Sequence, residues 1–272
     1  MSISGAGTQE SPYILDTYAD FNIVNTMANV GKYAKFNDSS LIVNMLDISK
    51  SGHQSFTLYV NLDANGCTFL NMYLTGTLTL EGTLSNLNLL NFCYVGTDAS
   101  VFTVNSSILN LTATGAIHTS SDTSLFKIAS DSYVAQSNMK IKATTASFYI
   151  LADSNSSLIQ TQIEVAASCQ STVGIAPVDA EPKIQSCKFS GRMYAPTVST
   201  MFINSSTFSL NVYDITIPQV VSISEDSNIV EASIYNNEKM TVTTASDNII
   251  GCSSDQMIDS EYLRQHGFAM AY

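Results

Sequence analysis

The chain of 272 residues contains no tryptophan and few charged residues of either sign. Asp, Glu, Lys and Arg make up only 12% of it, about half the share found in average globular proteins. Its 11 basic residues are spread along the sequence and leave a net charge of −12. Because nucleic-acid binding needs a clustered basic surface and anionic membranes attract basic segments, the composition argues against both as partners.

Long apolar runs are also missing. No stretch approaches the 18 consecutive apolar residues of a membrane-spanning helix, so no membrane insertion is expected. Residues 1–7 lack the basic and apolar regions of a secretion signal. We therefore expect a protein made in the cytoplasm and not exported by that route.

Recognisable catalytic patterns are absent too. The five cysteines are widely spaced and form no C-x-x-C pair, which favours free thiols filling core positions over metal or disulfide sites. His53, His118 and His266 lie far apart, and no G-x-S-x-G sequence occurs. We predict no catalytic residues and no enzymatic activity.

What the sequence does contain is one short phrase that returns seven times: an apolar strand, an Asn or Asp, small polar residues, and a second apolar strand. The Asn or Asp markers are Asn105, Asp131, Asp153, Asp179, Asn204, Asp226 and Asp247. Successive markers are 26, 22, 26, 25, 22 and 21 residues apart. Similarity at such a period indicates a repeat architecture.

The apolar residues within each repeat alternate, as in Phe102 and Val104 or Phe126 and Ile128. Alternation is typical of strands with one buried face. Leucine-rich repeats need a fixed leucine frame that these units lack, and propeller blades need about 40 residues each. We therefore predict an all-β fold, a single right-handed parallel β-helix of nine or ten coils.

Both ends of the chain carry helix signals. Thr17 and Asp20 have capping-box spacing ahead of a helix expected from Tyr18 to Ala28, with Gly31 as its stop. Ser253 or Ser254 is expected to begin a C-terminal helix that Gly267 ends. We expect residues 1–40 and 253–272 to cap the open ends of a β-helix formed by residues 41–252, all within one domain.

The marker aspartates are the candidate metal site. Asp131, Asp153 and Asp179 fall in consecutive repeats, and if they align they lie about 5 Å apart. Like charges at that distance raise one another's pKa or recruit a cation such as calcium. The alternative is a turn-forming role, favoured because Asn105 and Asn204 occupy the same column and Asn and Asp both suit tight turns.

Without tryptophan, any glycan binding would depend on the 13 tyrosines. Tyr149 is expected to face outward, because its neighbours Phe148 and Ile150 face inward. Tyr194, Tyr213 and Tyr235 recur at intervals of 19 and 22 residues and could form an outer stripe. The alternative is that they form a stacked ladder with a structural role.

The ends of the chain resemble those of a known group of proteins. The opening phrase Gly7-Thr8-x-x-Ser11-Pro12-Tyr13 resembles the opening of bacterial and phage right-handed β-helix proteins of the pectin-lyase type, and Ser253-Ser254-x-Gln256-Met257 is similar to how such domains end. With no secretion signal, the resemblance favours a non-enzymatic phage virion component: a fibre, a capsid decoration or a receptor-binding part. The alternatives are a polysaccharide lyase or hydrolase, or an adhesin at the bacterial cell surface.

The same resemblance implies the partners. They are other virion or surface proteins, with a host-surface glycan and a homo-oligomer also compatible. No cofactor is expected unless the aspartates bind calcium.

Overall fold

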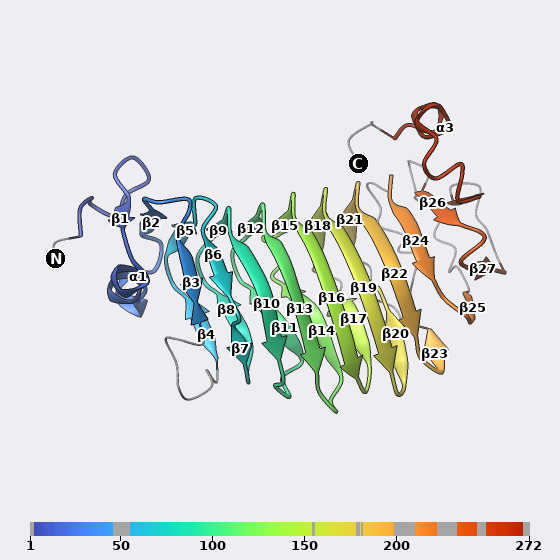
Figure 1. The fold of residues 1–272 in the computed structure, drawn as a ribbon, viewed down its shortest axis with the longest axis horizontal. Helices are drawn as coiled ribbons and strands as arrows, with labels where there is room; N and C mark the ends of the chain where they lie inside the picture. The colour runs from blue at the N-terminus through green and yellow to red at the C-terminus, as the bar shows by residue number, and fades with distance from the viewer. Residues whose placement is uncertain are drawn as a thin grey trace.

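The computed structural model describes residues 3–45, 55–153, 156–177, 180, 182–198, 210–221, 233–243 and 249–268. The chain forms a parallel β-solenoid of about 8 turns with repeats of about 24 residues (Figure 1). This is fewer than the nine or ten coils predicted from the sequence. Within the described residues, no helix is long and apolar enough to cross a membrane.

Each turn contributes a strand to as many as three parallel sheets, called here sheets A, B and C. Sheet A contains β1 (Tyr13–Leu15), β2 (Tyr33–Phe36), β5 (Asn61–Asp63), β9 (Leu84–Ser85), β12 (Ile108–Leu109), β15 (Val134–Ala135), β18 (Ser157–Ile159) and β21 (Lys183–Gln185). Sheet C contains β4 (Phe56–Leu58), β8 (Leu78–Leu80), β11 (Ser100–Val104), β14 (Thr123–Ile128), β17 (Phe148–Leu151), β20 (Thr172–Gly174) and β23 (Thr197–Val198).

Sheet B is the longest and has the longest strands. It contains β3 (Ile42–Asn44), β6 (Thr68–Leu70), β7 (Tyr73–Leu74), β10 (Asn88–Tyr94), β13 (Thr112–His118), β16 (Asn138–Thr145), β19 (Gln162–Cys169), β22 (Lys188–Tyr194), β24 (Val212–Thr216), β26 (Ser233–Asn236) and β28 (Ile249–Cys252). The short strands β25 (Val220–Val221) and β27 (Thr241–Val242) pair separately.

The alternation of apolar and polar residues in the sequence corresponds to side chains that point alternately into the solenoid and out to its surface. Along β16 and β19 every second residue is buried, while the residues between them lie largely at the surface. Inward residues stack on their equivalents in the next turn: Phe102 lies 5.4 Å from Phe126 between ring centroids. Burial of these side chains along the whole axis supplies the main stabilising free energy.

The corner between sheets A and B has its own repeated residue. Asn86, Asn110, Gln136, Gln160, Ser186 and Leu210 all have positive φ and all lie two residues before a sheet B strand. Asn tolerates this left-handed conformation better than most residues. At the first corners the amides also form a ladder, in which the Asn110 amide donates to Asn86 Oδ1 at 2.8 Å.

The residue that follows each of these positions has its side chain pointing inward, and in several of the later turns this residue is polar. Ser137, Thr161 and Asn211 are buried at this position. Asn211 accepts a hydrogen bond from the Cys187 backbone N–H at 2.9 Å and donates one to the Ile184 carbonyl at 3.1 Å. These side chains therefore satisfy backbone groups that the corner leaves unpaired.

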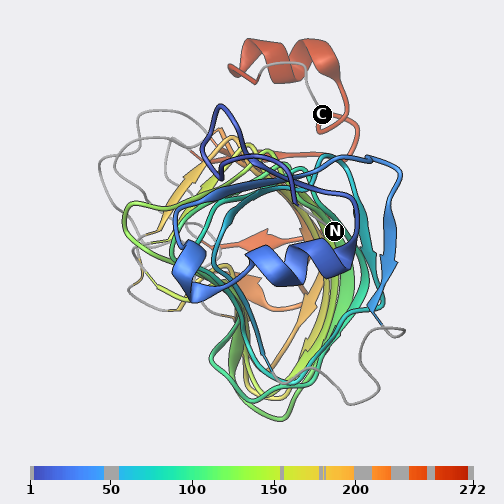
Figure 2. The ribbon, with the colours of Figure 1, turned by 90° about the vertical axis from the view of Figure 1, so that its left-hand side faces the viewer.

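The predicted N-terminal cap is present. Helix α1 (Tyr18–Val24) begins with the capping box of Thr17 and Asp20, and the short 3₁₀ helix η1 (Met27–Asn29) follows. Figure 2 shows α1 lying across the end of the solenoid. Phe21 packs there against Phe36, Phe56 and Phe69. The helix is shorter than predicted, and the apolar residues Ile23 and Met27 are exposed.

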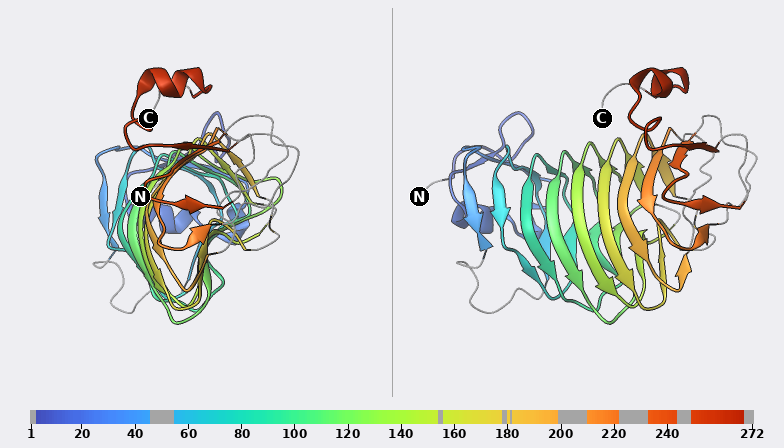
Figure 3. Two further views of the ribbon diagram at one scale, coloured as in Figure 1. Left: turned by 90° about the vertical axis from the view of Figure 1, so that its right-hand side faces the viewer. Right: turned by 45° about the vertical axis from the view of Figure 1, so that its right-hand side comes forward.

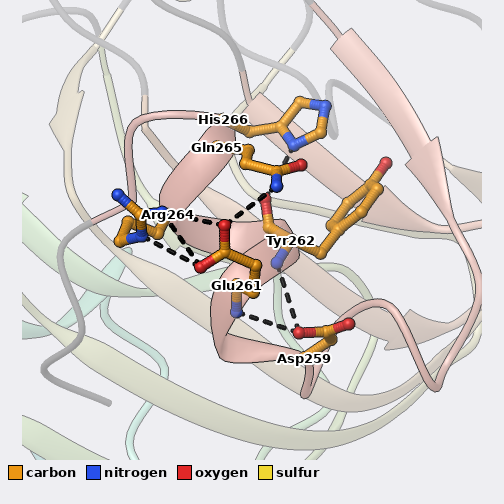
Figure 4. Close-up of polar contacts among 6 residues, drawn as sticks. All are labelled: Asp259, Glu261, Tyr262, Arg264, Gln265 and His266. Carbon is orange, nitrogen blue, oxygen red and sulfur yellow. Dashed lines mark hydrogen bonds and ion pairs between the residues drawn. The ribbon is translucent and has the colours of Figure 1, made fainter.

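The C-terminal segment differs from the prediction in two ways. Ser253 begins a turn rather than a helix, and α3 (Ser260–Gln265) starts only after Asp259, whose carboxylate accepts from the N–H groups of Glu261 and Tyr262 (Figure 4). Gly267, with φ of 85°, ends it as expected. Figure 3 shows this short helix near the C-terminal end of the solenoid, where it lies beside the last turns and not across the end.

The outer face of sheet B explains this placement. In the last turns its outward residues include Val212 and Ile234, which pack with Cys252, Phe268 and Leu263 into a second apolar cluster. In earlier turns the equivalent positions hold Asn138, Gln162 and Lys188. The C-terminal segment therefore covers an apolar patch on the side of the solenoid.

Replacing Ile128 with Asp should abolish folding to a soluble protein, because the residue is fully buried and an unpaired buried charge costs several kcal/mol. Its neighbour Lys127 is exposed on the same strand, so Lys127→Asp should be close to neutral. Soluble yield and thermal unfolding measure both variants. An Ile128→Asp protein as stable as Lys127→Asp would contradict the assigned inner face.

Asn211→Leu should lower the free energy of unfolding by about 1–3 kcal/mol for each backbone group left unsatisfied at Cys187 and Ile184. Asn138→Leu is the matched control, since that asparagine is exposed at the start of β16. Urea unfolding of both variants measures the difference. Equal stability of the two would show that the buried amide contributes nothing.

Candidate functional site

The predicted aspartate column is not formed by the two members that the structure describes. Strands β14 and β17 pair residues 25 apart, such as Thr123 with Phe148, whereas Asp131 and Asp153 are 22 apart. Asp131 is exposed in a turn, and Asp153 accepts a hydrogen bond from the Ser156 hydroxyl at 3.3 Å. Asp179 lies outside the described residues. Among those described, no three His, Cys, Asp or Glu side chains are grouped so as to hold a metal ion.

The four predicted tyrosines do not share a face. Tyr149 is half-buried between the fully buried Phe148 and Ile150, as expected of an outward residue, and burial raises its pKa. Tyr194 is exposed at the end of β22. Tyr213 is buried and stacks on Phe189 at 5.5 Å. Tyr235, its partner in β26, is half-buried against the core.

The predicted outer stripe of Tyr194, Tyr213 and Tyr235 is therefore wrong. The interval of 19 residues between the first two does not match the pairing of β22 with β24, in which Phe189 lies beside Tyr213, 24 residues on. Tyr194 instead has Ser168 as its neighbour.

A different surface stands out on sheet B. One outward row runs through five successive turns and reads Ala116, Lys142, Ala166, Arg192 and Thr216. Every second turn thus carries a cation, with a small residue between. Since neighbouring strands lie about 4.8 Å apart, the backbones that carry Lys142 and Arg192 are about 10 Å apart.

These two cations differ from the charged residues next to them. Lys140 pairs with Glu164 at 2.7 Å, and Asp214 pairs with Lys239 at 2.9 Å. Lys142 and Arg192 form no ion pair with any described residue. In a chain with a net charge of −12, two cations of one row without an ion pair to any described residue form a local positive surface.

The surface is also hollowed. A depression of about 380 Å³ is lined by Ala166, Ala167, Ser168, Arg192 and Tyr194. Small side chains on β19 form its floor, while the longer Arg192 and Tyr194 on β22 form one wall. Across the floor on β16 lie Lys142 and Thr144. We call the surface formed by Lys142, Thr144, Ala166, Ser168, Arg192 and Tyr194 the cationic hollow.

Sequence reasoning missed the cationic hollow because the basic residues are far apart along the chain. The signal was present in part: Lys140, Lys142, Lys188 and Arg192 all occupy outward positions of alternating strands in nearby repeats. Their register was needed to bring them together, and it is fixed only by strand pairing.

Two other surface depressions have charged residues that are already paired. The first, of about 480 Å³, lies on sheet A near the N-terminal loop, and there Lys35 pairs with Asp63 at 3.3 Å. The second, of about 230 Å³, lies beside the C-terminal turn and contains the pair of Lys239 and Asp214. The second also contains Lys188, which forms no ion pair with a described residue but shares the depression with Asp214 and Asp255, whereas the described lining of the 380 Å³ depression holds no carboxylate.

Four of the five cysteines occupy core positions, as predicted. All five are free, and only Cys93 is not buried. Burial raises the pKa of the Cys67 thiol to about 11 and that of Cys187 to about 12. Since the thiolate is the reactive form, these thiols are poor nucleophiles at neutral pH.

Comparison of the chain with protein-family models, with curated proteins and with solved structures gave no match. The architecture therefore rests on the strand pairing described above.

At pH 8 a thiol reagent such as dithionitrobenzoate should react first with Cys93, which is partly exposed, and with the other four only on unfolding, because those four are buried. Cys93→Ser should remove the fast phase, and Cys67→Ser should leave it unchanged. Rapid reaction of all five thiols in the folded protein would contradict the assigned burial.

Proposed function

We propose that the protein is a non-enzymatic binding rod, in which the solenoid holds an outward surface in fixed register for a partner. The observation that carries this proposal is the cationic hollow, whose unpaired Lys142 and Arg192 lie on strands paired on both sides. Paired strands fix the backbone that carries these side chains, so binding a partner costs side-chain entropy but little backbone entropy.

Several observations favour binding over catalysis. Asp131 and Asp153, the described carboxylates best placed by sequence for an acid pair, are not level with one another. Among the described residues that line the depression there is no carboxylate or histidine, and His118 lies outside this lining, beside Thr144 on the neighbouring strand β13. General acid–base chemistry requires such a group within hydrogen-bond reach of the substrate.

The setting we propose is a phage virion, with the rod serving as a fibre, a capsid decoration or a receptor-binding part. Support for this comes from the similarity of the chain ends to bacterial and phage β-helix proteins and from the solenoid architecture itself. In such an assembly many copies are displayed together, so individually weak contacts add up to tight attachment. An adhesin at a bacterial surface would use the same physics.

Replacing Asp131, Asp153 and Asp179 together with Asn tests the alternative of an enzyme or an obligatory calcium site. We expect the same melting temperature with and without calcium in wild type and triple variant, because Asn keeps the turn hydrogen bonds. We expect no cleavage of a polysaccharide panel by either protein. Cleavage by wild type, or calcium-dependent stability that the variant loses, would overturn the proposal.

Asp63→Asn is the matched control for that experiment. Asp63 accepts hydrogen bonds from Asn65 and Asn86 and pairs with Lys35. Although burial works in the opposite direction, these contacts leave the pKa of Asp63 below its ordinary value. At pH values above the pKa that Asp63 has in the unfolded chain, its charge therefore stabilises the fold. This contribution is lost as the pH falls through the lower pKa of the folded state. At pH 7 the substitution should lower the melting temperature, showing that the assay detects a structural aspartate.

A further inference from the structure

We propose that the cationic hollow binds a carboxylate-bearing polysaccharide in which acidic and neutral sugars alternate, lying along the solenoid axis. This inference rests on the proposed function and names the partner chemistry of its site. Arg192 and Lys142 each contact a carboxylate, and the intervening neutral sugar lies over Ala166 and Ser168.

The spacing of charges supports this orientation. Lys142 and Arg192 belong to the same outward row, two turns apart, or about 10 Å. Between them Ala166 leaves the floor low, so a chain following the row meets no obstruction from one cation to the next. Two anionic groups separated by one neutral ring match this alternation, because successive acidic sugars in such a chain are one disaccharide apart.

The remaining side chains suit a sugar. Tyr194 is 50% exposed and lies next to Arg192, where its ring is accessible to an apolar sugar face. The Ser168 and Thr144 hydroxyls form no side-chain hydrogen bond with described residues, so both remain available to sugar hydroxyls. A small, mostly open depression with a few convergent polar groups fits one or two rings better than a folded domain.

Other anionic polymers fit less well. An extended acidic peptide binds a sheet through a free edge, but β16, β19 and β22 are each paired with a strand on both sides. Nucleic acid needs many phosphate contacts, whereas the hollow offers two unpaired cations in a protein of charge −12. The polysaccharide is therefore the occupant that the surface favours.

The test uses the full chain and fluorescently labelled hyaluronan oligosaccharides, whose carboxylates occur on every second ring. The same oligosaccharides with their carboxyl groups reduced to alcohols provide the uncharged probe. Polyglutamate and single-stranded DNA test the other polymer classes. Fluorescence anisotropy at low and high salt measures affinity, and we expect binding of the acidic sugar alone, weakened by salt as charges are screened.

Lys142→Gln combined with Arg192→Gln should weaken binding by about tenfold or more, as expected when charge-assisted contacts are lost. Lys127→Gln with Lys183→Gln removes the same charge from exposed positions on sheets C and A and should change affinity by less than about twofold. Tyr194→Ala should weaken binding with the salt dependence unchanged. Ala166→Glu should abolish binding, because the added carboxylate occupies the floor and pairs with both cations.

Four outcomes would overturn the proposal: no binding of the acidic oligosaccharide, equal binding of its reduced form, an equal loss in the Lys127/Lys183 control, or tighter binding of polyglutamate or DNA. Should the Lys142/Arg192 variant unfold, Ala166→Glu still tests the same site. Absence of binding would leave the non-enzymatic rod intact. Hyaluronan cleavage by wild type would overturn the rod while the variants still report on the site.

Discussion

The hydrogen bonds between successive turns are the constraint on which the rest of this structure depends. They run parallel from strand to strand and fix the distance between turns at about 4.8 Å. Each side chain therefore has a defined neighbour one turn above and one turn below. Phe102 must stack on Phe126, and Lys142 must lie beside Ala166. Core packing, corner ladders and surface rows all follow from this one register.

Features that depend on local sequence could be predicted without the structure. Alternation along segments such as Phe148 to Leu151 reflects the two faces of a strand, so strand, orientation and core follow together. The capping box at Thr17 and Asp20 is equally local, because it closes within four residues. The repeat period then indicates a solenoid, since short strands without helices at this spacing have few other ways to bury their faces.

Features that depend on register between turns could not be predicted, because the repeats differ in length within their loops. The Asn and Asp markers suggested a column, yet Asp131 and Asp153 are offset by about three residues from strand pairing. The repeated column of residues with left-handed backbone lies instead at the corner between sheets A and B, where it includes Asn86 and Asn110. Tyr213 was misplaced for the same reason: a regular spacing in sequence is not a regular position on the solenoid.

The cationic hollow also shows why a binding surface can be added to such a fold at little cost. Lys142 and Arg192 lie about one Debye length apart at 0.1 M salt, so their mutual repulsion is weak. Ala166, which lies between them, is uncharged and adds no repulsion. The inward residues on the same strands, such as Val165, are buried whatever side chains the outer face carries. The inward face holds the fold together, and the outward row is free to vary in chemistry. Paired residues such as Lys140 and Glu164 stay neutral as a unit, so on this row of sheet B the positive charge that a partner would meet comes from Lys142 and Arg192.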